Sequence, residues 1–389
     1  MIVSPSDTKK KAFSILFIAA VATVIYSNSF YASFHFDDTP AIVENYAIHR
    51  FDLKEIFTTS SRPVLDVTFA LNYYFGKLDV FGYHLVNLML HIANGVMLYF
   101  ILFWTINAIN SRNFPNPINF RVPLYASLIF IAHPVQTQAV TYIVSRSSVL
   151  VTTFYLLALL FFIRGFKFSS SSPVTRHPLL YFIGAFLASC LGMGTKQEAA
   201  TLPLMLLIYD FYFISHGDLK VLKSHYKIHV LMFSTMFIAV YLSFSGLREF
   251  ISFDYSKGIP MPQEEPITSL QYFFTQLHVI PYYIKLLFIP TNLNLDYDWP
   301  ITRNLDLATG LYFVLLSSII IAAIILYRRA RLFSFGIIWF FVTLSVTSSF
   351  VVIYDVIFEH RLYLPSIGFA IFLAFLIGKI SALKAGRTN

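Results

Sequence analysis

Long apolar runs, separated by short polar stretches, make up most of this 389-residue chain. The runs are residues 12–30, 83–106, 122–131, 149–163, 179–193, 199–214, 228–245, 270–289, 310–327, 332–350 and 362–378. A membrane-spanning helix needs roughly 20 mainly apolar residues, and several of these runs are shorter. Polar residues that flank a short run must then lie at membrane depth, which is tolerated where they line a polar cavity. The pattern predicts an all-α polytopic membrane protein with such a cavity.

The distribution of Lys and Arg predicts the orientation. Lys9–Lys11 precede the first run, which we interpret as a retained signal anchor with a cytoplasmic N-terminus. If every run crossed the membrane, the basic loop at Arg328 would lie outside. Pro281 lies in the middle of residues 270–289 and should break a helix there into two short pieces. We therefore expect an interfacial or re-entrant helix pair at this segment, about ten transmembrane helices in all, and both termini in the cytoplasm.

The external side is predicted to be acidic and to carry the longest loop, residues 31–82. Apolar positions between Pro63 and Phe75 recur at near-helical spacing, which indicates an interfacial helix. Few residues follow Gly378. We therefore expect residues 1–389 to form a single transmembrane domain without a soluble C-terminal domain.

The composition agrees with an integral membrane protein whose partners include lipids. The chain is 57% hydrophobic and 12% charged, whereas soluble domains carry about 25% charged residues. Its formal charge of +8 lies in short loops between apolar runs, as the positive-inside rule expects. The positive charge therefore does not indicate a nucleic-acid partner.

Two adjacent carboxylates, Asp37 and Asp38, stand where the first apolar run ends. Such a pair is costly to leave unpaired beside a membrane, so it is a candidate site. The structural alternative is that these residues cap the helix that follows, since Asp is a favoured N-cap.

Several short motifs occur in order along nearly the whole chain and together resemble a known family. They are residues 36–43 (FDDTPAIV), 61–64 (SRPV), 69–73 (FALNY), 81–91 (FGYHLVNLMLH), 132–140 (AHPVQTQAV), 145–146 (SR), 196–198 (KQE), 201–203 (TLP), 296–300 (DYDWP) and 361–368 (RLYLPSIG). As a set they are similar to the transmembrane and tetratricopeptide-repeat O-mannosyltransferases and their prokaryotic relatives. The repeats themselves do not occur in this sequence, so the acceptor-recruiting role that they imply is not carried over.

This resemblance implies a C-type glycosyltransferase fold and an enzyme that takes a sugar from a polyprenyl-phosphate carrier. The acceptor would be a hydroxyl of an exported protein or a surface glycolipid, on the non-cytoplasmic face of a bacterial or archaeal inner membrane. Glycosyl transfer needs a carboxylate that removes the proton of the acceptor. We predict that Asp37 is this base and that Asp38 tunes it or orients the acceptor. Transfer should invert the anomeric configuration.

The phosphate of the donor needs fixed cations in a low-dielectric site. Arg146, Lys196 and Arg361 lie at external edges of apolar runs and are the candidates. Their structural alternative is ion pairing with Glu198 and Glu359. Arg62 fits either phosphate binding or a contact that pins the first loop against the Asp pair.

Other external polar residues are candidates for acceptor or sugar contacts: His35, His133, Glu198, Asp296, Asp298, His360 and Tyr363. A divalent cation stays open as a cofactor, since Asp and His suit one, although the spacing matches no compact metal motif. A lipid or sugar transporter and a noncatalytic scaffold are the competing functions. The lack of a Gly-rich nucleotide fingerprint fits a lipid-linked donor.

Overall fold

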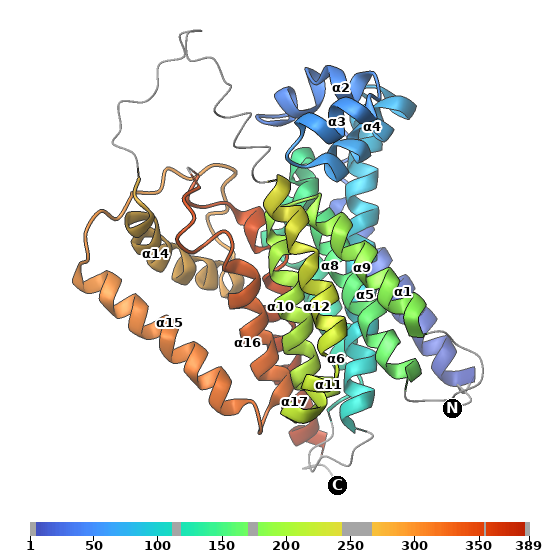
Figure 1. The fold of residues 1–389 in the computed structure, drawn as a ribbon, viewed down its shortest axis with the longest axis vertical. Helices are drawn as coiled ribbons and strands as arrows, with labels where there is room; N and C mark the ends of the chain where they lie inside the picture. The colour runs from blue at the N-terminus through green and yellow to red at the C-terminus, as the bar shows by residue number, and fades with distance from the viewer. Residues whose placement is uncertain (1–4, 111–117, 170–177, 243–266, 354, 386–389) are drawn as a thin grey trace.

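Helices dominate the computed structural model, which describes residues 5–110, 118–169, 178–242, 267–353 and 355–385 (Figure 1). No strand occurs within these ranges. The helices that run along the bundle are α1 (Pro5–Tyr26), α5 (Val80–Asn110), α6 (Val122–Ala132), α8 (Arg146–Ser169), α9 (Pro178–Met193), α10 (Leu202–Tyr209), α12 (Tyr226–Ser234), α16 (Arg331–Leu344) and α17 (Ser366–Ala385). The most extensive packing joins α8 to α9, α16 to α17 and α5 to α8.

Within the described residues, three helical stretches are long and apolar enough to cross a membrane: Val80–Asn110, Ile143–Lys167 and Leu307–Leu326. Five shorter apolar helices accompany them. An all-α membrane architecture is therefore supported, while the count of about ten spans stays a prediction. The expected run over residues 228–245 extends beyond the described residues at its end.

Residues 31–82 form a helical cap at the end of the bundle opposite both termini (Figure 1). Its elements are a π-turn η1 (Thr39–Val43), α2 (Tyr46–His49), α3 (Leu53–Thr59) and α4 (Pro63–Gly76). The cap has its own apolar core, which includes Ile42, Ile56 and Phe69. The helix predicted over residues 63–75 is confirmed as α4.

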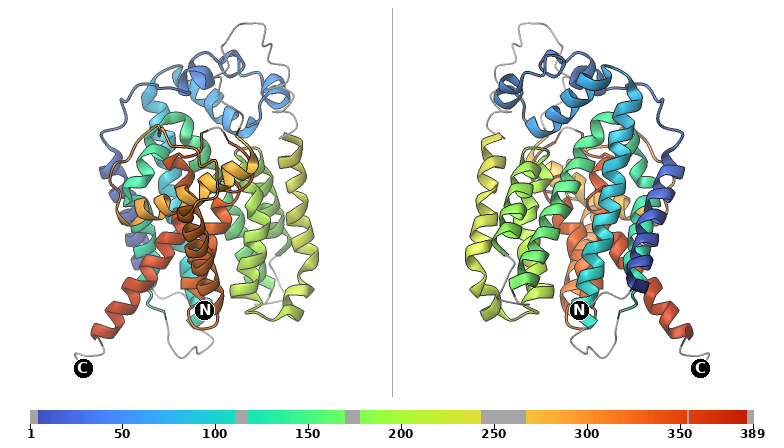
Figure 2. Two further views of the ribbon diagram at one scale, coloured as in Figure 1. Left: turned by 90° about the vertical axis from the view of Figure 1, so that its left-hand side faces the viewer. Right: turned by 90° about the vertical axis from the view of Figure 1, so that its right-hand side faces the viewer.

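The prediction that Pro281 breaks its helix is wrong. Helix α14 (Ser269–Phe288) is continuous through Pro281 and lies across the direction of the bundle, as an interfacial helix would (Figure 2). Three polar side chains dock it to one neighbouring segment: Tyr272 donates to the Thr347 carbonyl, Gln276 to that of Val356 and Tyr283 to that of Phe358. These contacts offset the backbone hydrogen bond that a proline removes.

Helix α15 (Leu307–Leu326) lies beside α14 at the edge of the molecule (Figure 1). Helices α16 and α17 approach each other more closely, at Gly336 and Gly368. A Cβ atom built on Gly336 would lie 2.6 Å from the Gly368 carbonyl oxygen. Only glycine permits this backbone contact, and it fixes the start of α17, next to the turn that carries Arg361.

Candidate active site

Asp37 and Asp38 differ in their exposure, and Asp38 is the buried member of the pair. It is 1% exposed. One carboxylate oxygen accepts the backbone N–H of His35 (3.0 Å) and the other that of Val144 (2.7 Å). Burial raises the pKa of Asp38, and the two N–H bonds oppose that shift. Its side chain makes no capping bond to η1, so capping of the following helix is not its role.

Asp37 is exposed on the same turn. Its backbone N–H donates to the Tyr142 hydroxyl at 2.9 Å. Its carboxylate is therefore the accessible one of the pair, and it is the one that can reach an acceptor. His35 is also exposed, with its ring 3.5 Å from the Ser33 hydroxyl.

Residues 137–148, which we call the link segment, contact both the Asp37–Asp38 turn and Lys196. The segment comprises α7 (Thr137–Thr141), a 3-10 turn η3 (Ile143–Ser145) and the start of α8. Tyr142 and Val144 bind the Asp37–Asp38 turn, and Ser148 follows Val144 by roughly one helical turn. The Ser148 hydroxyl accepts a hydrogen bond from the Lys196 ammonium at 2.8 Å, so the turn with the candidate base and a candidate phosphate ligand both contact this short segment.

Arg146 is fully buried within the link segment. Its guanidinium donates to the side-chain oxygens of Asn87 (2.6 Å) and Asn72 (2.7 Å) and to the Tyr83 carbonyl (3.0 Å). It also lies 4.5 Å from the Phe69 ring. Arg146 thus joins the cap to α5 and α8, and its donors are occupied by protein groups.

Lys196 ends the turn between α9 and the 3-10 turn η4 (Gln197–Thr201). Its ammonium lies 2.8 Å from the Glu198 carboxylate, and both side chains are almost fully buried. The ion pair foreseen as the alternative for Lys196 is therefore present. The second Glu198 oxygen is buried without a hydrogen-bond partner among the residues described. Burial lowers the pKa of Lys196, whereas Glu198 opposes that shift.

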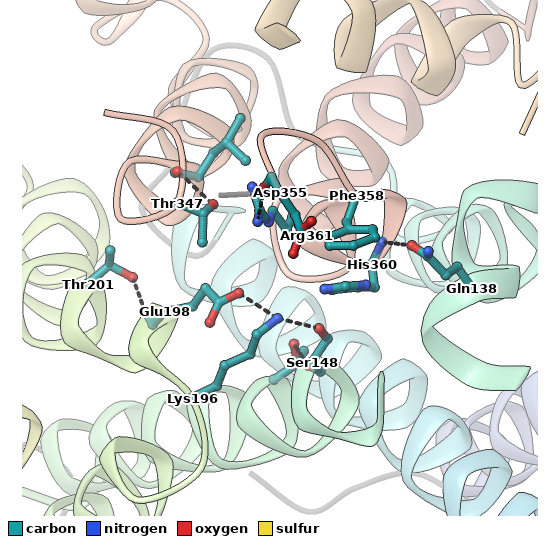
Figure 3. Close-up of polar contacts among 12 residues, drawn as sticks. Gln138, Ser148, Lys196, Glu198, Thr201, Thr347, Asp355, Phe358, His360 and Arg361 are labelled. Atoms are coloured by element: carbon teal, nitrogen blue, oxygen red, sulfur yellow. Dashed lines mark hydrogen bonds and ion pairs between the residues drawn. The ribbon is translucent and has the colours of Figure 1, made fainter. Parts of the chain in front are cut away.

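Arg361 and His360 extend from another 3-10 turn, η7 (Glu359–Leu362), toward the same space as Lys196 and Glu198 (Figure 3). Arg361 is 6% exposed and donates to the Asp355 carbonyl. Its Nη1 atom and the Nδ1 atom of His360 are buried, and neither has a partner within the described ranges. The Arg361 Nη1 atom is a donor in every protonation state, so it is available to an anionic or polar ligand.

Positive charge exceeds negative charge in this space. Burial, together with the nearby charges of Lys196, Arg361 and Arg62, lowers the pKa of His360 well below its usual value. Arg62 therefore lies near Lys196 and Arg361, and we call these three residues the cation group. Of the described carboxylates, Glu198 alone forms an ion pair with any of these three cations. A buried excess of cations is costly unless an anion compensates it.

Glu359 was the other predicted ion-pair partner, but it forms no ion pair with a described cation. It accepts hydrogen bonds from the Tyr297 hydroxyl and the Asn294 N–H, each at 2.6 Å, and burial raises its pKa. Its contacts anchor the loop that carries Asp296 and Asp298, which are both exposed. Trp299 of this loop packs on Tyr282 of α14, with ring centroids 5.0 Å apart.

Two candidates for acceptor or sugar contacts lie in structural networks. His133 accepts the Val135 N–H and bonds to the Leu287 carbonyl. Tyr363 is fully buried and bonds to His91 (2.6 Å) and Asn94 (3.1 Å) of α5. No group of three or more His, Cys, Asp or Glu residues in the described part of the chain is arranged to hold a metal ion.

The sequence did not single out three residues that the structure places at the site: Gln138, Tyr142 and Ser148. The Gln138 side chain accepts the His360 N–H at 2.7 Å and donates to the Leu295 carbonyl at 2.8 Å. Gln138 lies within one of the family-like motifs, which could have signalled it. Tyr142 and Ser148 lack such a signal, because an uncharged hydroxyl beside an apolar run is common.

Comparison with known proteins gives relatives over nearly the whole chain. The human protein O-mannosyl-transferase TMTC3 is 28% identical over 94% of this chain and 42% of its own length. The Caenorhabditis elegans protein O-mannosyl-transferase F38B6.6 is 26% identical over 95% of this chain and 52% of its own. The Xenopus laevis protein O-mannosyl-transferase tmtc2 is 31% identical over 51% of this chain and 24% of its own.

The chain spans about half, or less, of the length of these curated relatives. No protein-family model matches it, and no solved structure does. The resemblance indicated by the motifs is nevertheless confirmed by alignments that cover almost every residue. The chain is a relative of the proteins named protein O-mannosyl-transferases.

Proposed function

We propose that this protein is an integral-membrane glycosyltransferase that moves a sugar from a polyprenyl-phosphate carrier to a hydroxyl acceptor. The observation that carries the proposal is the cation group, Lys196 and Arg361 with Arg62 nearby, in which the buried Arg361 Nη1 atom has no partner among the described residues and Glu198 is the one described acid that forms an ion pair. A phosphate would supply the missing negative charge. The names of the relatives support mannose as the sugar and a protein as the acceptor.

In this proposal the cation group stabilises the leaving phosphate. Lys196 and Arg361 supply positive charge where the bond between the anomeric carbon and the phosphate oxygen breaks, and the phosphate leaves with the electron pair. His360 is neutral and offers a hydrogen bond to the phosphate or the sugar. The low-dielectric surroundings strengthen each of these interactions.

Asp37 is the proposed base. The acceptor oxygen attacks the anomeric carbon from the face opposite the phosphate, its proton passes to the Asp37 carboxylate, and the configuration inverts. Asp38 positions this turn and makes no contact with substrate in the proposal. The exposed Asp37, on a cap opposite both termini, supports a site on the membrane face away from the termini. In this proposal that face is the non-cytoplasmic face of a bacterial or archaeal inner membrane.

We assign Arg146 a positioning role in place of phosphate binding. Its hydrogen bonds to Asn87, Asn72 and Tyr83 leave little capacity for a ligand, and it is enclosed by aromatic rings. It holds the link segment against the cap, and so sets the position of Asp37 relative to Lys196.

The test uses the full chain in lipid nanodiscs with radiolabelled polyprenyl-phosphate mannose and a pool of Ser- and Thr-containing peptides. We expect transfer to peptide, loss of donor binding in Lys196→Ala/Arg361→Ala, and loss of transfer with retained donor binding in Asp37→Asn. Lys54→Ala removes an exposed cation of the cap and serves as the matched control. Equal transfer by Asp37→Asn and the unmodified protein would refute Asp37 as base, and carrier movement across the bilayer without transfer would favour a transporter.

A further inference from the structure

We infer that a groove along α11 and α12 binds an anionic phospholipid, at the end of the bundle that carries both termini (Figure 1). Helix α11 (Leu219–Ser224) directly precedes α12 in the chain. The cap with Asp37 lies at the opposite end of the bundle. The inference therefore concerns a second site and does not depend on the proposed transfer reaction.

One wall of the groove is a single helix face. The groove has a volume of about 570 Å³, and its wall follows the apolar helical stretch Tyr226–Leu242. Residues three and four apart share a helix face, and the wall residues recur at that spacing: Tyr226, His229, Val230, Phe233, Ser234 and Phe237. Val230 is 65% exposed and Phe237 is 78% exposed. The wall is thus open and mainly apolar, as a surface that receives an acyl chain must be.

The α11 end of the groove is basic. Lys223 lines the groove, and Lys220 and Lys227 are exposed in the same helical hairpin. Among the residues that the structure describes, none of these lysines forms an ion pair. The neighbouring acid, Asp218, caps α11 by accepting the N–H groups of Lys220 and Val221. Basic clusters beside apolar helices attract anionic lipid headgroups, so a lipid phosphate is the complementary ligand.

His229 adds a fixed polar group to the wall. The fully buried Asp210 accepts hydrogen bonds from His229 Nε2 (2.8 Å), His225 Nδ1 (2.7 Å) and the Ser215 hydroxyl (2.6 Å). The His229 side chain is 8% exposed, and its Nδ1 atom is buried without a partner in the described part of the chain. Because Nε2 donates to the carboxylate, Nδ1 accepts in the neutral ring and donates in the protonated ring. A headgroup hydroxyl or a phosphate oxygen can satisfy it.

A phospholipid matches both parts of the groove. Its phosphate lies at Lys223 and one acyl chain lies along Val230 and Phe237. This order agrees with a bilayer, in which headgroups are at the end of a bundle and acyl chains beside its middle. A soluble anion would leave the apolar wall uncovered, and a neutral lipid would leave Lys223 without an opposite charge. The carrier of the proposed reaction acts at the cap end, so we assign the groove to a phospholipid of the other leaflet.

Native mass spectrometry of the full chain, released from detergent micelles, tests the charge preference with phosphatidylglycerol and phosphatidylcholine as probes. We expect phosphatidylglycerol to bind more tightly. Lys223→Gln should weaken its binding about fivefold, the effect of one lysine near an anionic headgroup, and leave phosphatidylcholine binding unchanged. Lys54→Gln, at an exposed lysine of the cap, is the matched control. Equal binding of the two lipids, or equal losses in the two variants, would overturn the inference.

A pair of valine substitutions tests the groove itself. Val230→Trp fills the groove, whereas Val314→Trp adds the same bulk on α15 at a valine with 63% exposure. We expect only Val230→Trp to reduce phosphatidylglycerol binding.

Photoreactive phosphatidylglycerol tests the location of the lipid and should crosslink within residues 222–237 of the unmodified protein. Crosslinks confined to other segments would overturn the inference. Full displacement of phosphatidylglycerol by an equimolar polyprenyl phosphate would also overturn it, because the groove would then take the isoprenoid carrier. None of these measurements needs a sugar donor, so their failure is distinct from a failure of the proposed transferase function.

Discussion

Asp37 and Asp38 are neighbours in the chain but have opposite surroundings. Asp38 is buried and both its oxygens accept backbone N–H groups, whereas the Asp37 carboxylate is exposed. The sequence predicted a site at this pair and favoured Asp37 as base. It could not assign their separate environments, because the partner that buries Asp38, Val144, lies 106 residues away.

Asparagine substitutions should separate the two roles. Asp38→Asn places an amide donor against a backbone donor, so we expect the free energy of unfolding to fall by about 1–3 kcal/mol. Asp37→Asn, at an exposed side chain, should change the free energy of unfolding by no more than about 0.5 kcal/mol. Thermal unfolding of the detergent-purified variants gives the comparison. A larger loss of stability in Asp37→Asn than in Asp38→Asn would contradict the assignment.

Lys196 should make donor binding depend on pH. Burial lowers its pKa, so it loses its proton at lower pH than an exposed lysine. An anionic phosphate prefers the charged form, and affinity should therefore be complete at low pH and fall as pH rises through the lowered pKa. Lys196→Arg keeps a charged guanidinium and should flatten this fall. Binding of geranylgeranyl phosphate, measured across the alkaline range, tests this fall in affinity. Parallel binding curves for the unmodified protein and Lys196→Arg would refute the explanation.

At the scale of elements, helix contacts position the cation group. Arg361 lies on η7, between the 347–358 segment docked on α14 and the start of α17. Periodicity predicted α4 correctly, whereas Pro281 was wrongly expected to break α14. A single proline removes one backbone hydrogen bond, and three tertiary hydrogen bonds to the 347–358 segment hold the helix together.

The glycine contact between α16 and α17 provides an element-scale test. Gly336→Ala would place Cβ 2.6 Å from the Gly368 oxygen, and the helices would have to separate, at a cost of about 1–3 kcal/mol. Donor affinity should fall together with stability, because α17 follows directly after the turn that carries Arg361. Gly310→Ala on α15 meets nothing within 4 Å and should leave both properties unchanged or stability slightly raised. Similar effects of the two variants would contradict close packing as the cause.

At the scale of the molecule, the link segment and Arg146 connect the cap to the bundle. We expect Arg146→Met to lose cooperative folding, since the side-chain oxygens of Asn72 and Asn87 and the Tyr83 carbonyl would each lose a buried partner, at about 1–3 kcal/mol apiece. Arg121→Met, at an exposed arginine, is the control. Thermal unfolding and donor binding are the measurements. A normally folded Arg146→Met protein with selectively weakened donor binding would instead support phosphate contact.

The orientation of the whole molecule is open to labelling. In a Cys190→Ser background, which removes the single cysteine, Ser33→Cys in the cap should react with a membrane-impermeant maleimide in intact cells. Arg329→Cys should react only after permeabilisation, because the positive-inside rule places its loop in the cytoplasm. Reaction of both from the same side would overturn the predicted topology.

The sequence by itself determined the helical membrane class, the family resemblance and the residue types of a site, because apolar periodicity and local motifs are properties of contiguous residues. Only the tertiary structure decided that Arg146 faces protein oxygens, that Glu359 faces Tyr297, and that Lys196 and Arg361 lie around one space in which the Arg361 Nη1 atom has no partner among the described residues. Burial and hydrogen-bond partners come from segments far apart in the chain, and no local pattern encodes which cation is compensated by protein and which still needs an anion.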